Sequence, residues 1–129
     1  GDFLFDGPHY DEYIQRLSAK KCRIKLIMGN HDSMKLYSEP IFEVQLPLYS
    51  YKNFWLSHCP IHPDELCGRI ANIHGHTHYN SILAQHNNNS CSVDLDSNYF
   101  SVCPEVNNYQ FVNFESIKEA YDILPISNS

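Results

Sequence analysis

The chain has 129 residues, enough to bury a hydrophobic core, and we expect a single domain over residues 1–129. Nine basic and fifteen acidic side chains give a net charge of −6 with the histidines neutral, which argues against non-specific nucleic-acid binding, because that affinity comes largely from Lys and Arg on phosphates. The five cysteines include no Cys-x-x-Cys pair, so they argue against a disulfide scaffold and indicate a reducing compartment. With no long apolar run and no secretory signal, we expect a cytoplasmic protein without a membrane partner.

The first part of the chain predicts a helix and then a buried strand. Apolar residues at i, i+3, i+4 and i+7 in the segment 10–17 predict a helix with one apolar face. We expect Asp6 as its N-cap and Pro8 in its first turn. The apolar run 23–28 then predicts a buried strand, which ends at Gly29.

The middle of the chain predicts three further strands. A short helical stretch near 34–37 leads into an expected strand over 41–46, and Pro47 suggests a turn after it. The apolar runs 54–56 and 69–74 predict two more strands, with a loop between them.

The last part of the chain continues the same alternation. A polar stretch over 86–90 predicts a mobile loop. Strand-like runs follow over 99–102 and 109–112, and Asn113 is expected to cap a final helix over 114–124. The whole chain therefore predicts one α/β unit.

Three short polar blocks, at 29–32, 57–58 and 75–78, directly follow apolar runs. They bring together neutral, basic and acidic groups that bind metals. Asn30 offers an amide oxygen, and His58 and His76 offer imidazole nitrogens. Oxygen and nitrogen ligands with no thiolate suit Mn²⁺, Fe, Zn²⁺ or Ni²⁺ in an open site.

Two histidines of the third block, His76 and His78, are separated by one residue. On a regular strand both rings would point to the same face, whereas on a tight loop each ring could reach a different ion. In the first block, His31 follows Asn30 and so lies within reach of anything bound to the metal. The next residue, Asp32, could orient the His31 ring and favour its protonated form.

These blocks resemble a known family. Gly1-Asp2, Gly29-Asn30-His31-Asp32, Ser57-His58 and Gly75-His76-Thr77-His78 resemble four of the five signature blocks of the calcineurin-like metallophosphoesterases, in the family's order. The stretches 56–66, 72–78 and 105–109 look most like the small phage and bacterial members. The resemblance covers nearly the whole chain and implies a metallophosphoesterase-type β-sandwich flanked by helices.

The resemblance also implies which residues bind metal. Asp2 would bridge two divalent ions, and Asn30, His58 and His76 would complete the protein ligands of one of them. His78 would bind the other ion. One well-supported metal site is therefore expected in this chain.

The implied reaction is hydrolysis of a phosphomonoester or phosphodiester, with a small phosphoester or a nucleotide as substrate. A metal-bound hydroxide would attack the phosphorus. His31 would contact the scissile phosphate and protonate the leaving oxygen, and Asp32 would support it.

The sequence departs from the family at one block. The family's Asp-x-His, which supplies two ligands to the ion that His78 binds, has no counterpart in this chain. We therefore expect the fold without its first strand and helix, with an omitted N-terminal segment or a second chain completing the sheet. A second hypothesis thus stays open beside the enzyme: a catalytically impaired or split remnant that acts as a binding or structural module, for example in a phage assembly.

Several other polar and aromatic residues are expected to be structural. Cys59, next to a proposed ligand, is interpreted as a small buried thiol. His74 is expected to be buried as a partner of other groups and not as a ligand. Tyr10, Tyr13 and Tyr37 are expected in the core.

Overall fold

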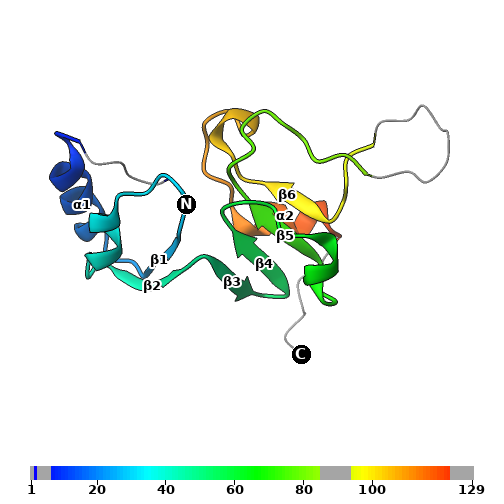
Figure 1. The fold of residues 1–129 in the computed structure, drawn as a ribbon, viewed down its shortest axis with the longest axis horizontal. Helices are drawn as coiled ribbons and strands as arrows, with labels where there is room; N and C mark the ends of the chain where they lie inside the picture. The colour runs from blue at the N-terminus through cyan, green and yellow to red at the C-terminus, as the bar shows by residue number, and fades with distance from the viewer. Residues whose placement is uncertain (1, 3–6, 85–93, 123–129) are drawn as a thin grey trace.

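The structure is a computed structural model that describes Asp2, residues 7–84 and residues 94–122. This part of the chain forms a two-stranded sheet of order β1-β2 and a four-stranded sheet of order β3-β4-β5-β6, together with two α-helices (Figure 1). The two sheets lie side by side along the longest axis of the molecule, and β2 leads directly into β3. The expected α/β class is confirmed.

The first helix, α1 (Tyr10–Ser18), forms where the apolar spacing predicts it, but it begins differently. Its N-cap is His9, whose side chain makes no capping hydrogen bond, and Pro8 lies before the helix and not in its first turn. The reason is a turn that closes just ahead of the helix, in which the Tyr10 N–H donates to the Gly7 carbonyl at 3.1 Å. The expected cap, Asp6, lies outside the described residues.

The small sheet consists of β1 (Ile24–Ile27) and β2 (Phe42–Leu46), which run parallel. A 3₁₀-helix over Met34–Ser38 lies between them in the chain. The core on this sheet is formed by buried side chains of α1, both strands and the 3₁₀-helix, namely Tyr10, Leu26, Leu36 and Phe42. Parallel strands need such a crossover connection, and its buried residues cover the sheet.

The expectation for the aromatic residues of this region holds in part. Tyr10 is buried and Tyr37 is half-buried against the same core, as expected. Tyr13 is 48% exposed, so its expected place in the core is wrong. The helix meets the sheet through Tyr10 and Ile14, and this leaves Tyr13 at the margin of the contact.

The larger sheet begins with a hairpin of β3 (Leu48–Tyr51) and β4 (Phe54–Ser57). Its two turn residues, Lys52 and Asn53, both have positive φ (44° and 68°), as a type I′ hairpin requires. The strand β3 occupies the segment after Pro47, where the sequence suggested a turn.

Two parallel strands, β5 (Ala71–His74) and β6 (Tyr99–Ser101), complete this sheet. The pairing of β4 with β5 places Ser57 opposite His74. The carboxyl ends of these two strands therefore meet at one edge of the sheet, and the loops that follow them begin side by side.

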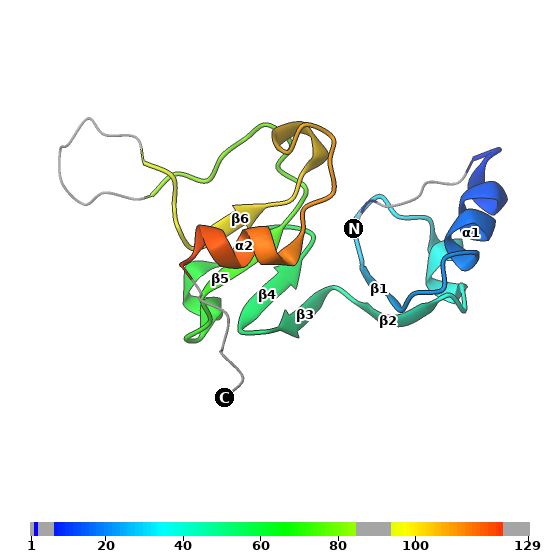
Figure 2. The same cartoon turned by 180° about the vertical axis from the view of Figure 1, so that it is seen from behind.

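The second helix, α2 (Phe114–Ala120), lies across one face of the larger sheet (Figure 2). Its Ile117 packs with Phe54, Ala71 and Ile73 of the strands in a second core. The expected cap is confirmed, since Asn113 Oδ1 accepts a hydrogen bond from the Glu115 N–H at 3.0 Å.

The expected strand over 109–112 is wrong. Asn108 and Tyr109 have positive φ (52° and 57°), which a strand cannot contain in succession. The Tyr109 N–H donates to the Pro104 carbonyl at 2.8 Å, so the chain closes a turn at this point instead of pairing with a strand. The expected loop over 86–90 lies outside the described residues.

The cap of α2 gives a first testable prediction. We expect Asn113→Ala to lower the free energy of unfolding by about 1 kcal/mol, because the Glu115 N–H loses its partner. Urea unfolding followed by circular dichroism measures the change. Asn113→Ser keeps a capping oxygen and serves as the control, so equal stability of the two variants would contradict the role of the cap.

In the described part of the chain, no helix is long and apolar enough to cross a membrane. The cysteines within these same ranges, Cys22, Cys59, Cys67 and Cys103, are all free.

Candidate metal centre

The polar blocks found in the sequence follow the carboxyl ends of β1, β4 and β5. The loops after β4 and β5 are tied together, since the Gly75 N–H donates to the His58 carbonyl at 3.0 Å. A Cβ added at Gly75 would lie 3.8 Å from that carbonyl oxygen, in ordinary contact distance. The pairing of two parallel strands thus fixes where the backbones of the second and third blocks stand.

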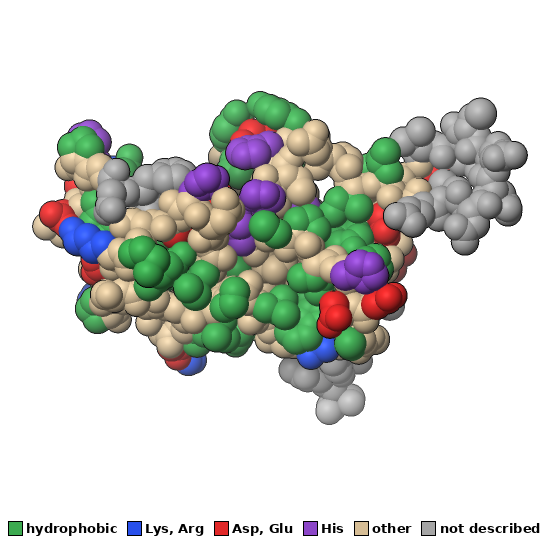
Figure 3. All heavy atoms as spheres, viewed as in Figure 1, with side chains coloured by type: hydrophobic (Ala, Val, Ile, Leu, Met, Phe, Trp, Pro, Cys, Tyr) green, Lys and Arg blue, Asp and Glu red, His purple; other side chains and the backbone are tan. Residues whose placement is uncertain are grey.

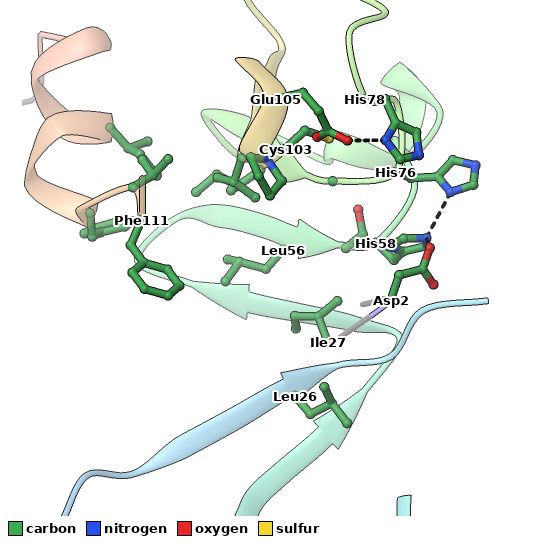
Figure 4. Close-up of a pocket in the computed structure, with 18 of the residues that line it drawn as sticks. Asp2, Leu26, Ile27, Leu56, His58, His76, His78, Cys103, Glu105 and Phe111 are labelled. Atoms are coloured by element: carbon green, nitrogen blue, oxygen red, sulfur yellow. Dashed lines mark hydrogen bonds and ion pairs between the residues drawn. The ribbon is translucent and has the colours of Figure 1, made fainter. Parts of the chain in front are cut away.

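Three of the predicted ligands converge on one atom of a fourth, His58 Nε2, and Figure 4 shows His58 with two of them, Asp2 and His76. His58 is buried, and its Nε2 lies 2.7 Å from Asn30 Oδ1 and 3.0 Å from His76 Nδ1. Asp2 Oδ2 lies 3.1 Å from the same nitrogen. The structure therefore brings together Asp2, Asn30, His58 and His76, which come from four separate segments of the chain.

The chemistry of this cluster fits a divalent cation. A single N–H on His58 Nε2 can satisfy only one of its three neighbours. The Asp2 carboxylate and the Asn30 amide oxygen are acceptors, so both would point at a positive charge between them. His58 Nδ1 is also buried and has no hydrogen-bond partner among the described residues. One carboxylate, one amide oxygen and two imidazoles form a donor set of the kind that binds transition metals.

Burial also favours the form of His58 that binds metals. Burial lowers the pKa of the His58 imidazole below its ordinary value, and the Asp2 carboxylate opposes that shift. A neutral imidazole has a free lone pair, which is the form a metal ion needs.

The third block is a tight loop and not a strand. His76 and His78 have positive φ (67° and 50°), and the Thr77 N–H donates to the Gly75 carbonyl at 2.8 Å. Left-handed backbone at residues other than glycine costs on the order of 1–3 kcal/mol and is often found at functional sites. The sequence left open whether His76 and His78 lie on a regular strand or on a tight loop, and the structure has the tight loop. The His76 ring contacts His58, whereas the His78 ring contacts Glu105.

His78 does not join the four converging side chains. Its Nδ1 lies 2.5 Å from Glu105 Oε1 (Figure 4). This hydrogen bond lowers the pKa of the Glu105 carboxyl below its usual value. The sequence did not indicate Glu105 as a site residue. It lies 27 positions after His78, and no sequence pattern indicates a contact between residues that far apart.

The first block is held by hydrogen bonds to both backbone groups of Gly29. Asp32 Oδ2 accepts from the Gly29 N–H at 2.8 Å, and the Tyr37 hydroxyl donates to the Gly29 carbonyl at 3.0 Å. The His31 N–H donates to Asp2 Oδ1 at 2.7 Å. The backbone on both sides of Asn30 is thereby fixed, and Asp2 is anchored beside it.

A buried asparagine on β5 fixes the loop that carries His58. Asn72 is fully buried, and its Nδ2 donates to Ser57 Oγ at 2.9 Å, while its Oδ1 accepts from the Ile61 N–H at 3.0 Å. Ser57 Oγ in turn donates to the Cys59 carbonyl at 2.6 Å. Sequence reasoning missed this residue. The signal available was an amide within the apolar run 70–73.

Three residues of the centre, Asp2, His58 and His76, line a cavity of about 950 Å³ whose wall is drawn from both sheets. His31 lines this cavity together with the proposed ligands Asp2, His58, His76 and His78. The rest of the wall is largely apolar and is drawn from both sheets and from the segment 102–117, as with Leu26, Ile27, Leu56, Ile73 and Phe111. Histidine side chains gather near the middle of this face, next to hydrophobic ones (Figure 3).

Two expectations for neighbouring residues have different outcomes. His74 is buried, as expected, with Nδ1 2.8 Å from the Gly75 carbonyl oxygen. Cys59 is exposed, so its interpretation as a buried thiol is wrong. The bond from Ser57 turns the Cys59 backbone carbonyl inward, and its side chain stays at the surface.

Comparison with known proteins places the fold and the family. One solved structure, a protein of unknown function called AQ665 from Aquifex aeolicus, has a TM-score of 0.62 and 23% identity over 93% of this chain and 73% of its own. That likeness shows the fold alone. None of the curated proteins compared with the chain matches it. The family model described as calcineurin-like phosphoesterase matches residues 1–123, nearly the whole length. The chain belongs to the calcineurin-like phosphoesterase family.

Proposed function

We propose that this chain hydrolyses a small phosphomonoester or phosphodiester, or a nucleotide, with Asp2, Asn30, His58 and His76 holding one divalent ion. Family membership supports a metal-dependent phosphoesterase in general. The observation that carries the proposal is the convergence of three metal-binding atoms on His58 Nε2, within 2.7 to 3.1 Å. A cytoplasmic location is part of the proposal, in keeping with the free cysteines of the described residues.

His31 is proposed as the general acid. When bound, metal ions in such a centre activate water and neutralise charge on the phosphate oxygens. His31 lines the same cavity as the proposed ligands, and its backbone N–H donates to Asp2, which holds the His31 backbone beside the centre. From there it would donate a proton to the leaving oxygen of a bound ester. Asp32 fixes the start of this block through Gly29, and we propose that it also supports the His31 ring.

His78 is proposed as a ligand of a second ion. Its Nδ1 is engaged by Glu105, so Nε2 is the nitrogen left to bind a metal. A carboxylate on the far nitrogen of a ligating histidine is a common support, because it fixes the orientation of the ring and raises its basicity.

A binding or structural module that holds one ion is the second candidate. The observation in its favour is the separation of His78 from the four converging side chains, since its short contact is with Glu105. A module of this kind would bind metal through the cluster around His58 without turning over a substrate.

Metal analysis with an activity assay tests the proposal. We expect the purified chain to bind divalent metal and to hydrolyse a chromogenic phosphodiester in the presence of Mn²⁺. His76→Ala should lower the bound metal, because it removes one of the four converging donors. His9→Ala, which changes an exposed histidine that is not one of the converging side chains, is the control.

The outcomes separate the two candidates. Metal binding that depends on His76 without turnover in excess Mn²⁺ would favour the module and sink independent catalysis. Equal metal content in the His76 and His9 variants would contradict the centre itself.

A further inference from the structure

We propose that the Cys59 thiolate is an additional ligand of the ion held by His58 and His76, which makes this centre selective for Zn²⁺ or Co²⁺ over Mn²⁺. The inference rests on the proposed metal centre and deepens it, since it names the class of metal that the centre prefers. The sequence did not indicate Cys59 as a metal ligand, because its side chain was expected to be a small buried thiol.

The geometry groups the thiol with two proposed ligands. One metal-binding atom from each of His58, Cys59 and His76 lies within 4.8 Å of the other two. In a tetrahedral Zn²⁺ site with bond lengths of about 2.1 and 2.3 Å, a nitrogen and a sulfur ligand stand about 3.6 Å apart. The difference is at most about 1.2 Å, and rotation of the exposed Cys59 side chain between its staggered rotamers moves the sulfur by more than that.

The backbone that carries the thiol is held in place. The Cys59 carbonyl accepts from Ser57 Oγ at 2.6 Å, and Ser57 is itself held by the buried Asn72. Two residues further on, the Ile61 N–H donates to Asn72 Oδ1 at 3.0 Å. Because these bonds stand on both sides of Cys59, its Cα has a fixed position relative to His58.

The environment of the thiol suits ligation. Cys59 is free and exposed, so no disulfide competes for its sulfur. The neighbouring His58 is buried, and its Nδ1 has no hydrogen-bond partner among the described residues. This histidine therefore also has a buried ring nitrogen that no hydrogen bond occupies. On binding, the thiol would release its proton to water and donate a sulfur lone pair to the ion.

Ligand chemistry then predicts the metal preference. A thiolate is a soft ligand that favours Zn²⁺ and Co²⁺, whereas carboxylate, carbonyl and water ligands suit Mn²⁺. Without the sulfur, the cluster of Asp2, Asn30, His58 and His76 offers only oxygen and nitrogen. With it, the site gains a donor that Mn²⁺ uses poorly.

Cobalt substitution tests the proposal. The wild-type chain and the variants Cys59→Ser, Cys67→Ser and His76→Ala are titrated with less than one equivalent of Co²⁺. Bound cobalt is measured by equilibrium dialysis, and thiolate ligation by the sulfur-to-cobalt charge-transfer absorption in the near ultraviolet. Cys67 is the matched control because it is also an exposed, free cysteine.

We expect the charge-transfer band in wild type and in Cys67→Ser, and its loss in Cys59→Ser while cobalt remains bound. Competition titrations should show Zn²⁺ affinity reduced by at least about tenfold in Cys59→Ser, with Mn²⁺ affinity little changed. Loss of the band in His76→Ala should accompany loss of cobalt.

Two results would overturn the inference and leave the proposed function standing. One is His76-dependent cobalt binding with no charge-transfer band in wild type. The other is a band that persists in Cys59→Ser or that disappears in Cys67→Ser. A wild-type chain that binds no cobalt, zinc or manganese would overturn the inference and the proposed metal centre together.

Discussion

Replacement of His31 by glutamine is expected to lower the turnover of a phosphoester by about 10²–10⁴-fold while leaving the metal content unchanged. The ring lines the cavity beside the proposed ligands, but it is not one of the side chains that converge on His58. Its backbone N–H, which holds Asp2, is retained in the variant. The loss should therefore be confined to proton donation.

The choice of substrate makes this test specific. An acid helps a poor leaving group most, because a good leaving group departs without a proton. We expect a large loss of kcat for an alkyl phosphodiester and a much smaller loss for a p-nitrophenyl ester. His9→Gln is the control for the removal of a histidine. Equal losses on both substrates, or loss of metal, would contradict the assignment of His31 as an acid.

Replacement of Asn72 by leucine is expected to lower the free energy of unfolding by about 2–4 kcal/mol. The side chain is fully buried and bonds to Ser57 Oγ and to the Ile61 N–H. Leucine has a similar volume, so the cost comes from polar groups left without partners and not from a cavity. Because the same bonds hold the loop after β4, the variant should also bind metal more weakly through His58.

Urea unfolding in the presence of a chelator measures this stability change without a contribution from bound metal. Asn80→Ala removes an exposed asparagine and is the control, expected to stay within about 0.5 kcal/mol of wild type. A comparable stability of the two variants would show that the buried amide network contributes little.

The strand ends could be predicted from the sequence because each of them is marked by a simple pattern. The apolar runs before Gly29 and Ser57 form β1 and β4, and the blocks that follow these strands lie where the runs end. The gathering of His58 and His76 follows from the same pattern, since loops after parallel neighbouring strands share one edge. Asn30 follows β1 of the small sheet, and its approach to His58 depends on how the two sheets lie together. Their roles as ligands stay predictions.

Other parts could not be predicted, because they depend on backbone angles or on contacts between distant residues. The segment 109–112 has the apolar residues of a strand, but the positive φ angles of Asn108 and Tyr109 are incompatible with strand backbone. The contact of Glu105 with His78 depends on the turn that follows β6, and no periodicity reports such a contact. The exposure of Cys59 likewise depends on the path of the loop after β4, where Ser57 Oγ holds the Cys59 carbonyl, and no sequence pattern reports that path.

The cluster that His58 forms with Asp2, Asn30 and His76 has a mechanical consequence. Asn30 follows a strand of the small sheet, whereas His58 and His76 follow strands of the larger one, and Asp2 stands at the start of the chain. An ion bound by all four would be a cross-link between the sheets, and folding would be thermodynamically linked to metal concentration. At a free metal concentration one hundred times the Kd, that linkage amounts to about 2.7 kcal/mol in favour of the native state. The same ion would then serve as cofactor and as clamp, and a chelator would remove both functions at once.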